Sequence, residues 1–330
     1  MDLTTTYLGL ELRNPLVASA GPLASTVDGV RALADAGVGA VVLPSLFEEQ
    51  IRRESERDFR LALAGTESYA EALSYLPGTA LDAWPHHDLR LVEKAAAAVA
   101  VPVIASLNGV SPGGWTSYAT AVQDAGAAAI ELNVYYLSDD PVAPARDAEQ
   151  RCVELLAAVK DAVCIPVAVK IGPNFSSLGE LALRLDQAGA DGLVLFNRFM
   201  QVGIDPETFT VSAGFQLSSP AEAALPRWWI SRLRGKVGCS LAATTGVETA
   251  ADVAAYLLAG ADVIMTTSAL LRHGAGYAAE LLDGLTAWLD RKGFESVAEA
   301  RGLLSAQVGL PVPGRSGYLS ALGQATRAFG

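Results

Sequence analysis

The stretch DAGAAAIELNV, residues 124–134, has three counterparts elsewhere in the chain. They are DAGVGAVVLPS (35–45), QAGADGLVLFN (187–197) and LAGADVIMTTS (258–268). Each begins as a helix end with a glycine, and glycine suits the left-handed residue that closes a helix. The apolar run that follows is too short for a helix and is mostly apolar on both faces, as strands of parallel sheets are. The pattern therefore predicts a recurring unit in which a helix is followed by a buried strand.

The spacing of these units predicts the number of strands. Gly126, Gly189 and Gly260 are 63 and 71 residues apart, which leaves room for about two strand–helix units in each gap. Apolar runs without the pattern occupy the other strand positions: PLVASAG (15–21), VPVIASL (101–107), PVAVKI (166–171) and SLAATTG (240–246). Eight strands that alternate with helices predict an α/β fold of the (β/α)8 TIM barrel type.

Helices and two insertions complete the predicted barrel. The helices are expected at 27–36, 88–100, 114–125, 145–163, 176–188, 220–235, 249–259 and 275–291. Residues 46–85 form an insertion after strand two, and residues 199–219 form another after strand six. Long excursions at the C-terminal ends of strands are typical of lids over the active face. No linker divides the chain, so residues 1–330 are expected to form a single domain.

The composition argues against several classes of protein. The 330 residues are 51% hydrophobic and the formal net charge is -12, which disfavours binding to nucleic acid. The cysteines Cys152, Cys164 and Cys239 are too sparse for an iron–sulfur or zinc site and fit a reducing cytoplasm. No carboxylate spacing around His86 and His87 supports a metal site. With neither a signal peptide nor an apolar run of about 18 residues, we expect a cytoplasmic protein without a membrane span.

The predicted barrel indicates where the functional residues should lie. In such barrels the working residues lie at the C-terminal ends of the strands. Here those ends are rich in small residues, hydroxyls and amides, with two cations: Ala20, Gly21, Pro44, Ser45, Asn108, Asn133, Lys170, Asn197, Arg198, Thr244, Thr245, Gly246, Thr266, Thr267 and Ser268.

Two features of these strand ends indicate an anionic ligand. Lys170 lies between apolar residues, where an unpaired charge is expensive. It is either a lysine whose ammonium reaches the barrel mouth or a cation that faces an anionic cofactor or intermediate. TTG (244–246) and TTS (266–268) follow strands seven and eight, the usual phosphate site of these barrels. The same threonines and serine could instead be ordinary helix caps.

Asn133 and Asn197 end two buried strands, although asparagine is poor in strands. Each could make a local hydrogen bond at the start of a loop. Alternatively, the two planar amides could recognise a planar heterocycle, because each offers a donor and an acceptor.

In this order, these residues resemble the dihydroorotate dehydrogenase family of FMN-dependent barrels, over about residues 5–295. The similar stretches are LGLELRNPLVASAG, AAIELNV, PVAVKIG, the asparagine of LFN, and TTGVETAADVAAYLLAGADVIMTTSALL. The resemblance implies that FMN lies across the barrel mouth, with Lys170 near the N1/O2 edge of its ring. It also implies that Asn133 and Asn197 face the substrate ring. The implied cofactor site comprises Ala20, Gly21, Ser45, Asn133, Lys170, Thr244, Thr245, Gly246, Thr266, Thr267 and Ser268.

The chain departs from the family mainly on the substrate side. Where the family has Asn-x-Ser-Cys-Pro-Asn, residues 133–138 read NVYYLS, so that Tyr136 stands at the position of the usual base. Pro44 replaces a common lysine, and residues 72–78 lack the asparagines of the family's substrate loop. A glycine pair expected near 214–220 is replaced by FQLSSP, with Ser218 and Ser219.

The resemblance implies the oxidation of dihydroorotate or a related cyclic substrate, as a step of pyrimidine metabolism. A base removes a proton from one carbon while a hydride leaves the neighbouring carbon for the flavin. Tyr136 is the expected base and Ser138 an expected substrate contact, but a tyrosine with a pKa of about 10 is a poor base unless that pKa is lowered. Asp139 or Asp140 could act instead, or Tyr135 and Tyr136 could simply form a wall of the pocket.

The expected partners are a small substrate, a soluble electron acceptor and a second copy of the chain. Apolar surface helices and the adjacent Trp228 and Trp229 make a homodimer plausible. Two other functions remain open from the sequence. One is a non-redox lyase or isomerase that uses the same phosphate loops, with Lys170 as a Schiff-base amine. The other is a flavin-binding protein that has lost its base.

Overall fold

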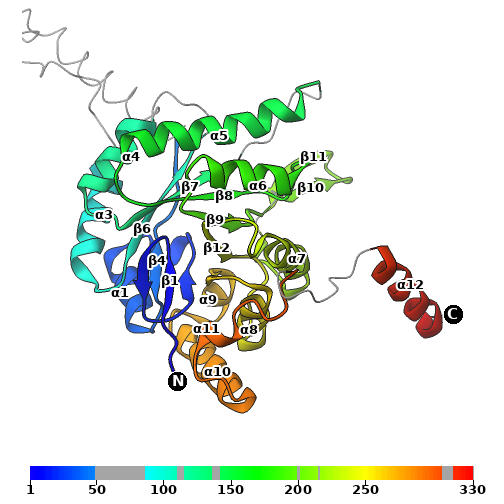
Figure 1. The fold of residues 1–330 in the computed structure, drawn as a ribbon. Coiled ribbons are helices and arrows are strands. Elements are labelled where there is room, and N and C mark those ends of the chain that lie inside the picture. The colour runs from blue at the N-terminus through cyan, green and yellow to red at the C-terminus, as the bar shows by residue number, and fades with distance from the viewer. Residues whose placement is uncertain are drawn as a thin grey trace, which may run out of the picture.

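A closed barrel of eight parallel strands forms the body of the protein in the computed structural model, which describes residues 1–48, 86–109, 115–135, 142–198, 201–214, 216–306 and 315–329 (Figure 1). The barrel strands are β3 (Leu16–Ala18), β4 (Ala40–Val42), β6 (Val103–Asn108), β7 (Ala129–Val134), β8 (Val167–Ile171), β9 (Gly192–Leu195), β12 (Ser240–Ala243) and β13 (Val263–Thr266). β13 pairs with β3 and β4 pairs with β6, which closes the ring. The predicted (β/α)8 TIM barrel is confirmed.

Helices surround this barrel at the predicted places. They are α1 (Val27–Asp35), α3 (His86–Ala98), α4 (Trp115–Asp124), α5 (Ala145–Ala162), α6 (Leu178–Gln187), α7 (Ala224–Leu233), α8 (Ala250–Ala259) and α10 (Tyr277–Lys292). Shorter helical segments are η1 (Pro22–Ala24), η3 (Pro220–Ala223), α9 (Ser268–His273) and α11 (Val297–Ala300). The C-terminal helix α12 (Arg315–Phe329) is exposed over residues 318–328. No helix in the described part of the chain is long and apolar enough to cross a membrane.

The four glycines of the repeated pattern all adopt the conformation that the pattern predicts. The φ angles of Gly37, Gly126, Gly189 and Gly260 are 105°, 93°, 92° and 117°. Positive φ values of this kind are costly for residues with a Cβ, so glycine is suited to close the helix that precedes each strand. Each turn then delivers the chain into a buried strand of the barrel.

The barrel has an outer core and a smaller inner one. Outward-facing strand residues pack against the helices, whereas the interior contains a separate apolar cluster that includes Ala129 and Ala168. The hairpin of β1 (Thr5–Tyr7) and β2 (Leu10–Leu12) closes the N-terminal end, where Leu8 N donates a hydrogen bond to Ser240 Oγ. With this end closed, the mouth at the C-terminal ends of the strands is the place for a ligand.

The two predicted insertions differ in how much of them the structure describes. The insertion at 46–85 begins with the short strand β5 (Leu46–Phe47), which pairs with the end of β6. Residues 49–85 lie outside the described ranges. The second insertion contains an antiparallel hairpin of β10 (Gln201–Asp205) and β11 (Thr210–Gly214). Their assignment as lids, and that of the whole chain as one domain, stay predictions.

Candidate active site

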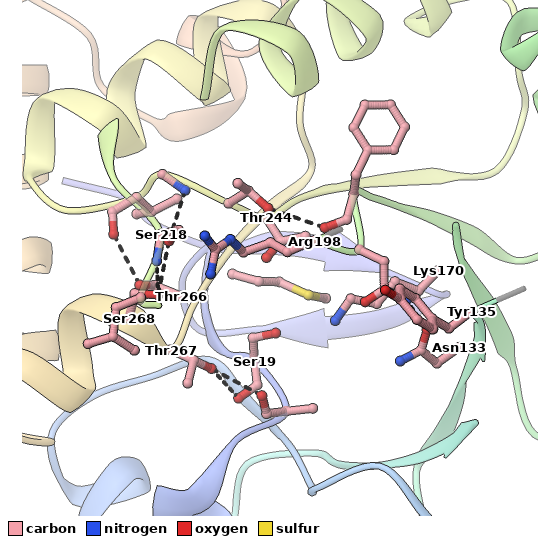
Figure 2. Close-up of a pocket in the computed structure, with 18 of the residues that line it drawn as sticks. Ser19, Asn133, Tyr135, Lys170, Arg198, Ser218, Thr244, Thr266, Thr267 and Ser268 are labelled. Atoms are coloured by element: carbon pink, nitrogen blue, oxygen red, sulfur yellow. Dashed lines mark hydrogen bonds between the residues drawn. The ribbon is translucent and has the colours of Figure 1, made fainter. Parts of the chain in front are cut away.

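A pocket of about 410 Å³ opens at the C-terminal ends of the barrel strands (Figure 2). Its volume falls within the range of about 300–1,000 Å³ that is typical of small-molecule sites. The described lining comprises Ser19, Ala20, Phe47, Asn108, Asn133, Tyr135, Lys170, Phe196, Asn197, Arg198, Gly214, Gln216, Leu217, Ser218, Thr244, Thr245, Gly246, Val247, Met265, Thr266, Thr267 and Ser268. The pocket therefore brings together residues that follow the first and the last strands of the barrel, β3 and β13, as closure of the barrel requires.

Most of the predicted site residues lie in this lining. Of the predicted residues that the structure describes, only Gly21 and Ser45 are absent from it. Gly21 lies directly behind it, since a Cβ on Gly21 would come within 2.5 Å of Thr267 Cγ2. Ser45 Oγ shares a 2.8 Å hydrogen bond with Ser106 Oγ instead. Tyr136 and Ser138, together with Asp139 and Asp140, lie outside the described residues.

Amide groups and a cation occupy one end of the pocket. The strand register places Asn133 beside Lys170, and Asn197 Nδ2 donates a hydrogen bond to Asn133 Oδ1. Lys170 Nζ lies 3.2 Å from Glu131 Oε1, with side-chain exposures of 9% for the lysine and 1% for the glutamate. Lys170 is therefore a paired, buried cation at the pocket rather than a lysine that extends into solvent.

Hydroxyl groups and a glycine backbone form the opposite end of the pocket, as Figure 2 shows for Ser218, Thr266 and Ser268. Ser218 N and Ser218 Oγ donate to Ser268 Oγ at 3.0 and 2.9 Å, and Gly246 N donates to Ser218 Oγ at 3.3 Å. Thr267 Oγ1 donates to Ser19 O at 2.7 Å, which joins the loop after β13 to the end of β3. The result is a compact set of donors and acceptors suited to an anionic group.

The threonines of this end are not ordinary side-chain caps. The N-cap of α8 is Thr249, three residues beyond Gly246 in the chain, and Thr267 occupies the N-cap position of α9 without a side-chain cap hydrogen bond. Thr245 has a φ of 81°, which is unusual for a β-branched residue. Such backbone strain clusters at functional sites, which agrees with the position of Thr245 in the pocket lining.

Arg198 is a second cation in the lining, and it follows Asn197 just after the end of β9. Its Nε and Nη2 atoms lie 3.0 and 3.3 Å from the Glu222 carboxylate oxygens, and Nη1 donates to Gln216 O. Partial burial acts to raise the pKa of Glu222, but hydrogen bonds from Ser219 and Arg198 outweigh this effect and lower it. Glu222 is therefore an ionised partner that fixes the guanidinium.

The charges of the lining favour an anion. Lys170 and Arg198 are the charged side chains of the described lining, and no carboxylate belongs to it. Among the described residues, no group of three or more His, Cys, Asp and Glu side chains could hold a metal ion. Cys152 lies on α5, and burial raises its pKa to about 12, so it offers no thiolate at neutral pH.

Several lining residues were not predicted as ligands from the sequence. Ser19 precedes Ala20 at a strand end that was recognised, so the same rule could have included it. Gln216, Leu217 and Ser218 come from the end of the insertion after β9. The departure at Ser218 was visible in the sequence, but its contact with Ser268, 50 residues away, was not.

Comparison with known proteins identifies the family of this chain. The family described as Dihydroorotate dehydrogenase matches residues 2–289. A protein of Methanothermobacter thermautotrophicus named Dihydroorotate dehydrogenase B (NAD(+)), catalytic subunit, is 30% identical over 308 residues, covering 91% of this chain and 98% of that protein. The protein of the same name from Methanocella arvoryzae is 29% identical over 297 residues, covering 88% and 94%. This chain belongs to the dihydroorotate dehydrogenase family, and it is an oxidoreductase of that type.

Proposed function

We propose that this protein binds FMN and oxidises dihydroorotate, or a related cyclic substrate, by removing a proton and transferring a hydride to the flavin. The observation that supports this best is the polarity of the pocket. A buried cation and two joined amides lie at one end, and a cluster of hydroxyls with a glycine N–H lies at the other. The family match does not favour the non-redox alternative.

The described residues fit FMN, a long ligand with a flat ring at one end and a phosphate at the other. At the hydroxyl end the backbone of Gly246 is packed closely against Ser219, because a Cβ there would come within 2.8 Å of Ser219 O. Thr245, Gly246, Thr267 and Ser268 would hold the phosphate, Lys170 would lie at the ring, and Ala20 would contact it. Bound FMN supplies a hydride acceptor, and the protein supplies its orientation and electrostatic environment.

Tyr136 remains our proposed base. Anaerobic mixing of the purified protein with dihydroorotate should bleach the flavin absorption band, and Tyr136→Phe should slow the bleaching about a hundredfold, which is typical of losing a general base. Tyr135→Phe is the matched control, because Tyr135 lines the pocket one residue earlier and should change the rate much less.

The outcomes of this experiment separate the possibilities. Bleaching that survives Tyr136→Phe at the wild-type rate would exclude Tyr136 as the base while leaving the enzyme class intact. A yellow protein that dihydroorotate does not bleach would point to another substrate or to a flavin-binding protein that has lost its base. A colourless protein whose spectrum does not change on adding FMN would contradict the whole proposal.

Arg198 is expected to recognise the carboxylate of the substrate. Orotate, the product of dihydroorotate oxidation, retains this carboxylate and serves as the probe. A hydrogen bond to a charged group contributes about 1.5–3 kcal/mol, so Arg198→Gln should weaken orotate binding at least about tenfold. Binding of uracil, which lacks the carboxylate, should change little. Both affinities can be measured by titrating each compound against the flavin spectrum. The exposed Arg31 on α1 gives a control, Arg31→Gln, with the same loss of net charge. Equal losses of orotate and uracil binding in Arg198→Gln would argue against carboxylate recognition.

A homodimer is part of the proposal. On the β10–β11 hairpin, Ile204 lies directly opposite Val211, and these residues are 76% and 74% exposed. Phe209 at the turn is 92% exposed. Exposed apolar faces of this kind support an interface between protein chains.

We propose a small, soluble electron acceptor, a class that includes the NAD(+) in the relatives' names. The cytoplasmic location stays a prediction.

A further inference from the structure

The carboxylate of Glu131 lies inside the barrel, two residues before the pocket residue Asn133 on β7. β7 alternates between two environments: Ile130 and Leu132 face the outer core, whereas Ala129 belongs to the inner cluster and Asn133 lines the pocket. Glu131 shares the parity of Ala129 and Asn133, so it also faces inward. Its side chain is 1% exposed and is not part of the described lining.

Lys170 is the hydrogen-bond partner of Glu131 in the described part of the chain. Lys170 Nζ donates to Oε1 at 3.2 Å, and the buried Oε2 atom has no partner among the described residues. Tyr7 belongs to the inner cluster below, where burial raises its pKa well above the usual value, with Coulombic repulsion from Glu131 as the next cause. An ionised carboxylate in such a place is expensive unless a cation balances it, and Lys170 is that cation.

This pairing has a consequence for any ligand in the pocket. An isolated ammonium at the amide end of the pocket would attract an anionic ligand with its full charge. An ammonium 3.2 Å from a carboxylate presents a dipole instead, whose attraction falls off faster with distance. Removing the carboxylate charge while keeping the side-chain volume should therefore strengthen the preference of the site for the more negative form of a ligand.

We propose that Glu131 is a positioning residue that fixes Lys170 at the amide end of the pocket and offsets its charge. The site then favours reduced FMN over oxidised FMN less strongly than it would if Lys170 had no carboxylate partner. The inference rests on the proposed FMN function and extends it to the redox balance of the cofactor. Glu131 acts through Lys170, because Lys170 is in the pocket lining and Glu131 is not.

The test is the midpoint potential of FMN bound to the whole protein, with Glu131→Gln as the variant. Glutamine keeps an acceptor for Lys170 Nζ but removes the negative charge. The ratio of affinities for reduced and oxidised FMN should rise at least tenfold, which corresponds to about 30 mV for a two-electron couple. Glu149→Gln is the matched control, because Glu149 is also a buried carboxylate, but it lies on α5 and contacts Ser176, so its ratio should stay at the wild-type value.

A conservative variant distinguishes charge from packing. Glu131→Asp keeps the charge and shortens the side chain, so its ratio should stay within threefold of the wild type. A ratio within twofold of the wild type in Glu131→Gln would overturn the inference, and so would an equal shift in Glu131→Asp. If Glu131→Gln does not fold, Glu131→Asp still decides, because a tenfold rise there contradicts an effect of charge. A wild-type protein that binds no FMN would overturn the proposed function and this inference together, an outcome distinct from the others.

Discussion

Lys170→Met should destabilise the protein by about 3–5 kcal/mol, because removing one member of a buried ion pair leaves the other charged and unpaired. Glu131 is the group left behind, and its Oε2 atom already lacks a hydrogen-bond partner among the described residues. Methionine matches the length of the lysine stem, so little packing is lost with the charge. The free energy of unfolding of the FMN-free protein, from urea denaturation, measures this loss without any contribution from the cofactor.

A double substitution separates the ion pair from simple packing. Glu131→Gln combined with Lys170→Met removes both charges and should recover most of the stability lost in Lys170→Met, because no buried charge then remains. Lys160→Met is the matched control: Lys160 Nζ lies 2.6 Å from Asp191 Oδ2, but these side chains are 28% and 34% exposed. That pair is partly screened by solvent, so its loss should cost about 1 kcal/mol or less. A double variant no more stable than Lys170→Met alone would contradict a charge pair.

The fold was predictable because its signals are local. A glycine at a helix end and a short apolar run depend only on neighbouring residues, and the four repeat glycines adopt positive φ angles in the structure. The positions of most residues of the proposed cofactor site followed from the same local reading, because the C-terminal ends of all strands of a closed barrel meet at one mouth. Thr245, Gly246 and Thr267 could therefore be assigned to the pocket before their contacts were known.

The pairing of charges was not predictable in the same way. Lys170 was recognised as a cation that needs a partner, but its partner Glu131 lies 39 residues earlier in the chain. Similarly, Glu222, the partner of Arg198, lies 24 residues after it. Nothing in the sequence says which carboxylate meets which cation across two strands or across an insertion. The parity of Glu131 and Asn133 along one strand could have placed Glu131 inside the barrel. It would not have shown that Oε2 lacks a hydrogen-bond partner in the described structure.

Gly246→Ala should cost about 2–5 kcal/mol of stability and should weaken FMN binding as well. The φ angle of Gly246 is 72°, a conformation that costs an alanine about 1–2 kcal/mol. A Cβ at this position would also lie 2.8 Å from Ala223 N and 2.8 Å from Ser219 O. These are backbone atoms that cannot rotate away, and overpacking of this kind costs about 1–3 kcal/mol more.

The same methyl group would disturb the proposed phosphate end of the pocket. Gly246 N donates to Ser218 Oγ, and Ser218 N donates to Ser268 Oγ, so moving Ser219 away from a new Cβ would pull on both contacts. Gly293→Ala is the matched control, because Gly293 has a φ of 78° but nothing lies within 4 Å of the position that a Cβ would take there. It should therefore lose only the conformational part, about 1–2 kcal/mol, and keep wild-type affinity for FMN. Urea denaturation and titration with FMN test both expectations, and equal losses of stability in the two variants would mean that the backbone around Gly246 can move aside. In that event, the close approach of Ser219 to Gly246 would not be what shapes this end of the pocket.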